Sequence, residues 1–230
     1  MISVAVVTYN GAPYIGEQLD SILANLRPED EVIVSDDGST DDTKKILEQY
    51  ERADGRVHVL DGPGQGVIAN VECALHHCSG DYIFLSDQDD LWMPDKVEKV
   101  MKVFEEENAV LVVHDAQVTD ASCQEVLMPS FFSYRHSGKG AVKNFIKNTY
   151  MGCCMAFRRE ALNVIFPIPK NIQMHDQWIG VKCDLKFHRT VFLPEPLICY
   201  RRHEKNVSDF GHNSVGVMIR NRLVFLKELL

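Results

Sequence analysis

The segment Asp81-Tyr-Ile-Phe-Leu-Ser86, followed at once by Asp87-Gln88-Asp89-Asp90, joins an apolar, strand-forming run to three carboxylates. A short continuous apolar run is typical of a buried strand in a parallel sheet. The carboxylates would then stand where the strand leaves the core. Neighbouring carboxylates repel one another, and Mg²⁺ or Mn²⁺ is a common means of neutralising them. The segment predicts a metal site at a sheet edge or, alternatively, a solvated turn whose aspartates cap the next helix.

Strand and helix patterns alternate on both sides of this segment over the first half of the chain. The predicted strands are residues 2–8, 31–35, 56–60, 81–86 and 109–114, and the predicted helices are residues 14–26, 40–50, 67–76 and 94–108. Continuous apolar runs support the strands, and apolar residues at helical spacing support the helices. This alternation predicts an α/β fold with a mainly parallel, doubly wound sheet and helices on both faces.

The second half has a less regular pattern. Residues 119–140 predict loops with a strand or two, and Pro167 and Pro169 end a predicted helix. The further predicted helices are residues 142–148, 159–165, 176–183 and 215–230, and the predicted strands are residues 153–157, 190–193 and 197–200. The last helix reaches the final residue, which leaves room for a longer natural chain.

Composition restricts the class of protein. A chain of 230 residues with 45% hydrophobic and 25% charged residues is typical of a folded domain. The 33 acidic and 24 basic residues give a net charge of -9, which argues against a nucleic-acid partner because that affinity rests on Lys and Arg. Seven cysteines without a CxxC pair favour reduced thiols. The sequence shows no signal peptide and no apolar run near the ~20 residues of a membrane helix, so we expect a soluble cytoplasmic protein.

Two further polar segments follow predicted strands, at residues 8–11 (TYNG) and 36–39 (DDGS). Ligands of open α/β sheets bind beyond the carboxyl ends of the strands, so these segments and the acidic cluster predict one site. A carboxylate of DDGS could accept a hydrogen bond from a nucleotide base, although a turn and helix cap explain the same residues. The TYNG segment fits either a plain loop or a surface that a base contacts.

Three other nucleotide-binding classes fit the sequence poorly. Residues 62–66 (GPGQG) resemble a phosphate loop but lack the GK[ST] ending, and no GxGxxG follows the first strand. A P-loop protein and a dinucleotide-dependent oxidoreductase are therefore excluded. A nucleotidyltransferase would carry a glycine-rich, basic loop after the first strand, where TYNGAPYIG stands instead.

Six motifs in a fixed order resemble the inverting nucleotide-sugar glycosyltransferases of family 2, which have the Rossmann-like GT-A fold. They are VVTYNG (6–11), VSDDGSTDDT (34–43), GDYIFLSDQDDLWMPDK (80–96), GCCMAFRR (152–159), MHDQW (174–178) and YRRHEKNVS (200–208). The resemblance covers residues 2–207. Within the family, SDQDDLW together with YRRH is most similar to bacterial rhamnosyltransferase-type enzymes of cell-surface polysaccharide synthesis.

The resemblance implies the donor and metal residues. Asp89 matches the principal ligand of Mn²⁺ or Mg²⁺ in the family's DxD motif, and Asp90 would support it. His203 would be a further ligand, although a surface histidine in a basic loop is the alternative. The nucleotide-binding residues implied in this way are Thr8, Tyr9, Asn10, Glu17, Asp37, Asn70 and Asp87.

The resemblance also implies the acceptor side. Asp176 matches the family's catalytic base, which an inverting, single in-line displacement requires to take the acceptor hydroxyl proton. On residue type alone, Asp176 fits a helix N-cap equally well. His175 would orient the carboxylate or be a structural histidine. The residues assigned to the acceptor or the diphosphate are Gly152, Cys153, His175, Trp178, Arg201 and Arg202.

The expected organisation is one domain over residues 1–230. It comprises a nucleotide-binding half (1–115), an irregular acceptor-binding half (116–207) and a C-terminal helical segment (208–230). The expected donor is dTDP-rhamnose first, with a UDP-hexose or UDP-N-acetylhexosamine as the alternative, and the expected acceptor is a glycan or a lipid-linked saccharide. A non-catalytic sugar-nucleotide-binding module is a rival that the presence of both Asp89 and Asp176 disfavours.

The apolar residues of the last helix leave three interpretations open. Val217, Leu223, Phe225 and Leu230 fit burial against the same domain, a second copy in a homodimer, or peripheral contact with the inner face of the cell membrane.

Overall fold

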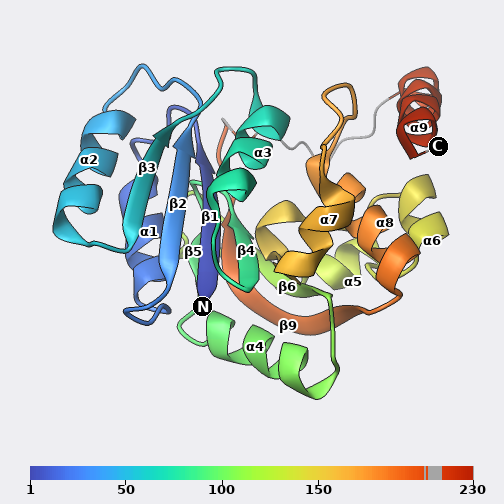
Figure 1. Ribbon diagram of the computed structural model, residues 1–230, viewed down its shortest axis with the longest axis horizontal. Helices are drawn as coiled ribbons and strands as arrows, with labels where there is room; N and C mark the ends of the chain where they lie inside the picture. Colours follow the sequence, from blue (N-terminus) through green and yellow to red (C-terminus); the bar gives the residue numbers. More distant parts are fainter. Residues whose placement is uncertain (205, 207–213, 230) are drawn as a thin grey trace.

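The computed structural model describes residues 1–204, 206 and 214–229 (Figure 1). Its strands are β1 (Ile2–Thr8), β2 (Glu31–Asp36), β3 (Val57–Asp61), β4 (Tyr82–Ser86), β5 (Leu91–Trp92), β6 (Leu111–Thr119), β7 (Val126–Met128), β8 (Met155–Arg158) and β9 (Thr190–Arg201). Its α-helices are α1 (Ile15–Leu23), α2 (Thr43–Ala53), α3 (Val67–His77), α4 (Lys96–Glu106), α5 (Phe131–Arg135), α6 (Ala141–Ile146), α7 (Leu162–Ile165), α8 (His175–Phe187) and α9 (Val215–Leu229). Short 3-10 turns, Gly152–Cys154 and Arg159–Ala161, flank β8. Residues 208–213 and Leu230, which belong to the predicted C-terminal segment, lie outside the described residues.

One sheet runs through both halves of the chain in the order β3-β2-β1-β4-β8-β6-β9-β5, with β7 paired to β6. The strands β3, β2, β1 and β4 are parallel, which confirms the prediction for the first half. Beyond β4 the sheet is mixed, because β8 is antiparallel to both β4 and β6 while β9 is parallel to β6. The chain leaves β6 at one edge and enters β8 from that same edge, so the two strands must run in opposite directions.

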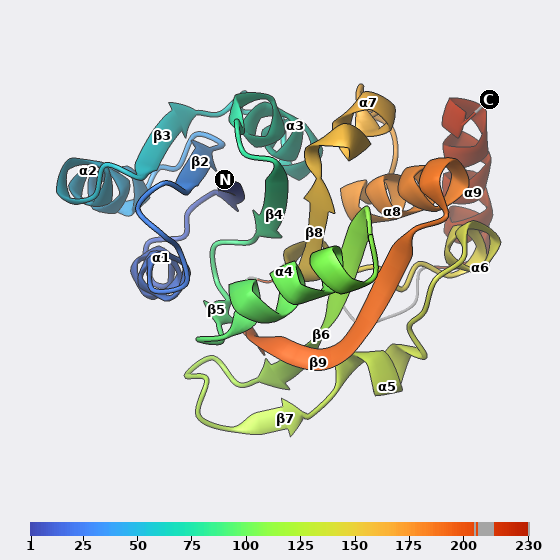
Figure 2. The ribbon, with the colours of Figure 1, turned by 60° about the horizontal axis from the view of Figure 1, so that its bottom comes forward.

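Helices cover both faces of the sheet, as predicted (Figure 2). On one face, Tyr50 of α2 donates a hydrogen bond to Gly16 O of α1, and Asn25 after α1 donates to Met93 O before α4. On the other face, α3 packs on β1 and β2 and is linked to the region after α7 through Glu72, which accepts from Ile168 N. The central strands are therefore buried on both sides, which explains their continuous apolar sequence.

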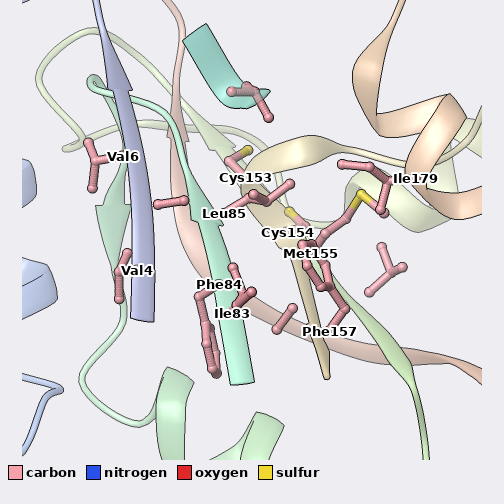
Figure 3. Packing of buried hydrophobic residues seen from close by; sticks show 14 of the residues in the cluster. Val4, Val6, Ile83, Phe84, Leu85, Cys153, Cys154, Met155, Phe157 and Ile179 are labelled. Atoms are coloured by element: carbon pink, nitrogen blue, oxygen red, sulfur yellow. The ribbon is translucent and has the colours of Figure 1, made fainter. Parts of the chain in front are cut away.

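A single apolar core joins the two halves (Figure 3). Its buried members come from β1, β4, the β8 region and α8: Val4, Val6, Ile83, Phe84, Leu85, Cys153, Cys154, Met155, Phe157 and Ile179. Burying one such aliphatic or aromatic side chain contributes roughly 1.5–3 kcal/mol to folding. Because β4 and β8 are paired directly, the first half and the second half of the chain share this core.

Three local expectations are corrected. The two strands predicted at 190–193 and 197–200 are one strand, β9, because register shifts opposite Asp115 accommodate Pro194 and Pro196, which cannot donate to a ladder. The strand predicted at 153–157 starts later, since Gly152–Cys154 forms a turn. Strand β5 was not predicted, because its two residues are extended only through pairing with β9.

Within the described part of the chain, the structure contains no helix with both the length and the apolar character that a bilayer-spanning segment requires. All seven cysteines are free thiols.

Candidate active site

The ends of β2, β1 and β4 are neighbours at one edge of the sheet, and Gln88 ties two of them together. Its Oε1 accepts hydrogen bonds from Thr8 Oγ1 (2.6 Å) and Tyr9 N (2.8 Å), and its Nε2 donates to Tyr9 O (3.2 Å). The amide also fills the space beside Gly11, where an added Cβ would lie 2.3 Å from Gln88 Oε1. Gln88 therefore sets the distance between the first loop and the acidic cluster, a role that the sequence did not indicate.

Asn10 links the first loop to the end of the DDGS segment. This residue has a positive φ of 52°, its N–H donates to Ser39 Oγ, and its Oδ1 accepts from Thr40 N, each at 2.8 Å. The ring of Tyr9 remains 55% exposed. The structure thus brings Thr8, Tyr9 and Asn10 to the same edge as the DDGS segment, with an aromatic face available to a ligand.

The two aspartates of DDGS have different environments. Asp36 is buried and accepts from Ser39 N at 3.0 Å. Asp37 is only partly buried, and its carboxylate accepts from the backbone N–H groups of Gln65 (3.2 Å) and Gly66 (2.7 Å). Asp37 therefore anchors the loop before α3 at the ligand edge. Its remaining exposed surface is compatible with the predicted base contact, which stays a prediction.

Asn70 lies below this edge rather than on it. The side chain is buried, its Nδ2 donates to Ser35 O (2.8 Å), and its Oδ1 accepts from Ser35 Oγ (2.6 Å). These bonds hold the end of β2 against α3. A direct contact between Asn70 and a nucleotide stays a prediction, whereas its structural support of the edge is observed.

The acidic cluster concentrates negative charge at the end of β4. Oxygens of Asp87 and Asp90 and the sulfur of Cys153 lie within 4.8 Å of one another. Burial, reinforced by Asp89, raises the pKa of Asp87 to about 7 and the pKa of Asp90 well above its usual range. Among the described residues, Asp90 Oδ2 is buried without a hydrogen-bond partner, while Asp90 Oδ1 accepts from Arg201 N at 3.2 Å. Such an arrangement is the environment that a bound cation stabilises.

Asp89 and His203, the two predicted metal ligands, are brought together although 114 residues separate them. Asp89 Oδ2 lies 2.9 Å from His203 Nε2 and accepts from Asn206 Nδ2 at 3.3 Å. The imidazole stacks on Tyr14 with ring centroids 4.5 Å apart. The contact between Asp89 and His203 is a hydrogen bond, and its length is also the separation of about 3 Å expected for two donors that bind one cation at about 2.1 Å and at right angles, so the metal role of the pair stays a prediction.

The donor set suits a hard cation. Carboxylate oxygen and imidazole nitrogen are acceptable to Mn²⁺ or Mg²⁺. Cys153 is a poor additional ligand, because its hydrogen bond with Cys154 and its burial raise the pKa of its thiol well above the usual range. The Asp89–His203 pair is therefore the better candidate for the cation than the Asp87–Asp90–Cys153 group.

Arg201 connects the end of β9 to the acidic cluster by hydrogen bonds. Its guanidinium donates to Asp89 O (3.0 Å), to Ala121 O (2.9 Å) and to Glu17 Oε2 (2.7 Å), and the side chain is buried. Glu17 is thus brought to the same site by an ion pair. The next residue, Arg202, is partly buried beside it, and its N–H donates to Thr119 O at 3.0 Å. Contacts of Arg201 and Arg202 with a diphosphate stay predictions.

Lys96 is a buried cation beside the acidic cluster that sequence reasoning missed. Its Nζ donates to Cys153 O (3.1 Å) and lies 3.8 Å from the centroid of the Trp92 ring. Burial lowers its pKa to about 8, and the nearby carboxylates of Asp87 and Asp90 oppose this shift. Lys96 lies four residues before Val100, which places it on the apolar face of α4. This spacing was the sequence feature that could have identified Lys96 as buried.

Asp176 lies in the first turn of α8 and is buried. Its Oδ1 accepts from Asn148 Nδ2 (3.1 Å) and from Gln177 N (2.5 Å), and burial raises its pKa to about 6. The alternative interpretation of Asp176 as the N-cap is wrong, because Met174 occupies that position. A carboxylate with a pKa near neutrality suits a general base. On this side of the site, Asn148 is the residue that sequence reasoning missed.

The end of β4 and the start of α8 meet at a small cavity. Asp87, Gly152 and His175 line it together with strand residues, and its volume is about 10 Å³, room for about one water. A Cβ at Gly152 would lie 2.8 Å from His175 Nε2, so the absence of a side chain at Gly152 leaves room for the imidazole, and a contact between Gly152 and the acceptor stays a prediction. Burial lowers the pKa of His175 to about 4, which keeps its imidazole neutral near pH 7.

Trp178 points into the core instead of toward the cavity. Its Nε1 donates to Ile165 O at 2.8 Å, and its ring meets Phe225 of α9 edge-on at 5.6 Å. The buried indole therefore joins α8 to α7 and α9, and a direct acceptor contact stays a prediction.

Solved structures define the class of fold. S. aureus TarS, in complex with UDP-GlcNAc, superposes with a TM-score of 0.74 at 21% identity, over 97% of this chain and 65% of that chain. The mannosyltransferase PcManGT from Pyrobaculum calidifontis, in complex with GDP-Man and Mn²⁺, superposes with a TM-score of 0.66 at 21% identity, over 99% of this chain and 64% of that chain. The fold is the GT-A fold of glycosyltransferases.

The family follows from the sequence. Residues 3–166 match the family described as glycosyl transferase family 2, and the chain belongs to it. The putative teichuronic acid biosynthesis glycosyltransferase TuaG of Bacillus subtilis is 32% identical over 193 residues, which are 79% of this chain and 71% of TuaG. A glycosyltransferase of Nostoc sp. is 27% identical over 213 residues, 89% of this chain and 66% of that protein. The chain thus spans about two thirds of the length of these relatives.

Proposed function

We propose that this chain transfers a sugar, with inversion, from a nucleoside-diphosphate sugar to an acceptor hydroxyl, and that it uses Mn²⁺ or Mg²⁺. The proposal rests on one observation: the acidic cluster at the end of β4 lies close to the carboxylate of Asp176 at the start of α8. The cluster that fits a diphosphate and its cation adjoins, through the cavity shared by Asp87 and His175, the turn that carries Asp176. Inverting transfer requires a leaving group and a base on opposite sides of one carbon, and the closeness of the acidic cluster to Asp176 supports assigning these two roles to them.

The residues divide the chemistry between them. Asp176 takes the proton of the acceptor hydroxyl as the oxygen attacks the anomeric carbon, and the bond from that carbon to the diphosphate oxygen breaks. Asp89 and His203 would hold the cation, which supplies positive charge for the departing diphosphate. Asn148 holds the carboxylate of Asp176 in place, and neutral His175 packs beside Gly152 next to the base.

The sequence supports a more specific proposal for the sugar and the nucleotide of the donor. Resemblance to rhamnosyltransferase-type enzymes favours dTDP-rhamnose, and the complex of TarS with UDP-GlcNAc makes a UDP sugar the alternative. TuaG, named for teichuronic acid biosynthesis, and the chondroitin synthase of Escherichia coli, which is 32% identical over 114 residues, support a polysaccharide or lipid-linked saccharide acceptor. Residues 1–115 would bind the nucleotide and residues 116–207 the acceptor.

Thermal shifts with a panel of sugar nucleotides, with and without Mn²⁺, test the donor and the cation together. A ligand that binds only the folded state raises the Tm, so the preferred donor should give the largest shift, and only with Mn²⁺. Asp89→Asn should remove the Mn²⁺-dependent shift. Asp176→Asn should keep it but lower transfer about 10²–10⁴-fold, the usual contribution of a general base.

Asp81→Asn is the matched control, since Asp81 is an exposed aspartate at the opposite end of β4. It should leave both shift and transfer unchanged. An unaltered Mn²⁺-dependent shift in Asp89→Asn would refute the metal role, and wild-type transfer by Asp176→Asn would refute the base. Donor binding without transfer in the wild type, over a full acceptor panel, would favour the non-catalytic module.

A further inference from the structure

Two segments of this acidic chain contain no Asp or Glu. They are residues 126–159 and 214–227, although the whole sequence has 33 acidic residues in 230. The same two segments carry nine Lys and Arg side chains, Arg135, Lys139, Lys143, Lys147, Arg158, Arg159, Arg220, Arg222 and Lys227. Positive charge is therefore concentrated in two places that are far apart in the sequence.

The fold places the helices of these segments side by side. Arg222 Nε of α9 donates to Ile146 O of α6 at 3.0 Å, and Phe145 meets Phe225 with ring centroids 6.0 Å apart. Figures 1 and 2 show α6 and α9 adjacent at one end of the molecule, remote from β3. Phe225 is buried by this packing, so the expectation of burial is confirmed for that residue, whereas Val217 and Leu223 are 44% and 63% exposed and do not follow it.

The outer surfaces of the two helices present apolar side chains to solvent. Val142 and Ile146 on α6 are 74% and 56% exposed. Ile219, Leu223 and Leu226 on α9, spaced four and three residues apart, are 43–63% exposed. We call these five residues, with Lys143 on α6, Lys147 directly after it, and Arg220 and Lys227 on α9, the α6–α9 face. Contiguous exposed apolar side chains bordered by basic ones are typical of a helix surface that lies in a membrane interface.

We propose that the α6–α9 face docks peripherally on an anionic phospholipid bilayer. Charge complementarity selects this occupant, because four basic residues border the face and Glu228 is the one acidic residue of α6 and α9, while the whole chain has a net charge of -9. An anionic surface would attract this face and repel the acidic remainder, which fixes the orientation. A second copy is disfavoured, since a two-fold contact would set the same basic residues against each other.

The face lies directly behind the acceptor side. Gln177, which follows Asp176, donates through Nε2 to Asn144 O of α6 at 2.7 Å, and Asn148 just after α6 donates to Asp176. Docking would thus hold the proposed base near the bilayer, where a lipid-linked acceptor is presented. This orientation, but not the docking itself, rests on the proposed function.

Co-sedimentation with vesicles tests the docking, with no donor or acceptor present. Wild-type protein should bind vesicles of phosphatidylcholine with about 30% phosphatidylglycerol at least about tenfold better than pure phosphatidylcholine vesicles, and NaCl should weaken binding. Ile146→Glu with Leu223→Glu should reduce binding about tenfold, and Lys143→Glu with Lys147→Glu should do the same.

The matched controls are Leu127→Glu on β7 and Lys102→Glu on α4, which are exposed outside the face. They should bind vesicles like the wild type, and circular dichroism confirms that every variant is folded. Equal binding to both vesicle types, or equal loss in the controls, would overturn the proposal. A dimer in analytical ultracentrifugation that Leu223→Glu dissociates, without vesicle binding, would assign the face to self-association. Transfer to a water-soluble acceptor should survive all four variants, so failure of docking is distinguishable from failure of the proposed function.

Discussion

At the scale of single residues, the properties of the site depend on side chains that carry no chemistry themselves. Gln88 holds the first loop against the acidic cluster, Lys96 places a positive charge beside it, and Asn148 holds Asp176. Each is an ordinary polar residue whose role comes from a partner at least 28 positions away. Replacing such a residue should change the pKa values or the positions of the reacting groups, while the reacting groups themselves remain present.

The pH dependence of transfer provides a test at this scale. A base acts only when deprotonated, and burial raises the pKa of Asp176 to about 6. We expect kcat/KM to be constant above that pH and to fall about tenfold per unit below it. The Asn148 hydrogen bond lowers the pKa of Asp176, so Asn148→Ala should move the acid limb to higher pH.

Asn163→Ala on α7 is the control, because Asn163 is exposed. Its pH profile should match that of the wild type. An acid limb that stays in place in Asn148→Ala would show that the hydrogen bond does not tune the base.

At the scale of elements, α8 shows how tightly the acceptor side is packed. This helix is buried on several sides, and at Gly180 an added Cβ would lie 2.3 Å from the ring of Tyr150. That ring cannot move freely, because Tyr150 OH donates to Asp184 Oδ2 at 2.7 Å. The glycine is therefore required for helix packing, although glycine is a poor helix former.

Gly180→Ala should lower the free energy of unfolding. Alanine gains about 1 kcal/mol from helix propensity, but overpacking a rigid neighbour costs about 1–3 kcal/mol. The contact at 2.3 Å makes the packing cost the larger of the two. The measurement is the midpoint of urea unfolding.

The control is Gly216→Ala in α9, where an added Cβ meets nothing within 4 Å. This variant should be as stable as the wild type or more so. Equal midpoints for Gly180→Ala and the wild type would contradict the packing argument.

At the scale of the whole molecule, the two functional halves are one structural unit. β8 and β9 of the second half pair with β4, β5 and β6, and β5 comes from the acidic-cluster loop of the first half. Neither half can unfold without exposing sheet edges and core of the other. Residue 115 is therefore not a boundary between independently folded units, and the division of functions there stays a prediction.

We expect the two halves to unfold in one cooperative transition. The two tryptophans allow a direct measurement, because Trp92 lies in the first half and Trp178 in the second, and both are buried. In Trp178→Phe the fluorescence reports the first half, and in Trp92→Phe it reports the second. Within each variant, the urea midpoint from fluorescence should equal that from circular dichroism. Separate midpoints would show that the halves unfold independently.

The sequence by itself determined the α/β class, the first four strands and the edge at which the ligand site forms. Residues 2–8 and 82–86 are continuous apolar runs, a local signal that survives folding because both faces of these strands are buried. The acidic cluster, TYNG and DDGS could be assigned to one edge because parallel strands present their carboxyl ends together. Asp89 and His203 were paired by family resemblance, not by any local pattern.

Only the tertiary structure decided the remaining features. The direction of β8, the continuity of β9 through two prolines and the short strand β5 all depend on partners distant in the sequence. The same holds for the roles of Gln88, Lys96 and Asn148 and for the adjacency of α6 and α9. Periodicity reports which side of an element is buried, but not which element buries it. Contacts between distant segments are set by the packing of the whole chain, and that packing places the acidic cluster near the turn that carries Asp176, and α6 behind that turn.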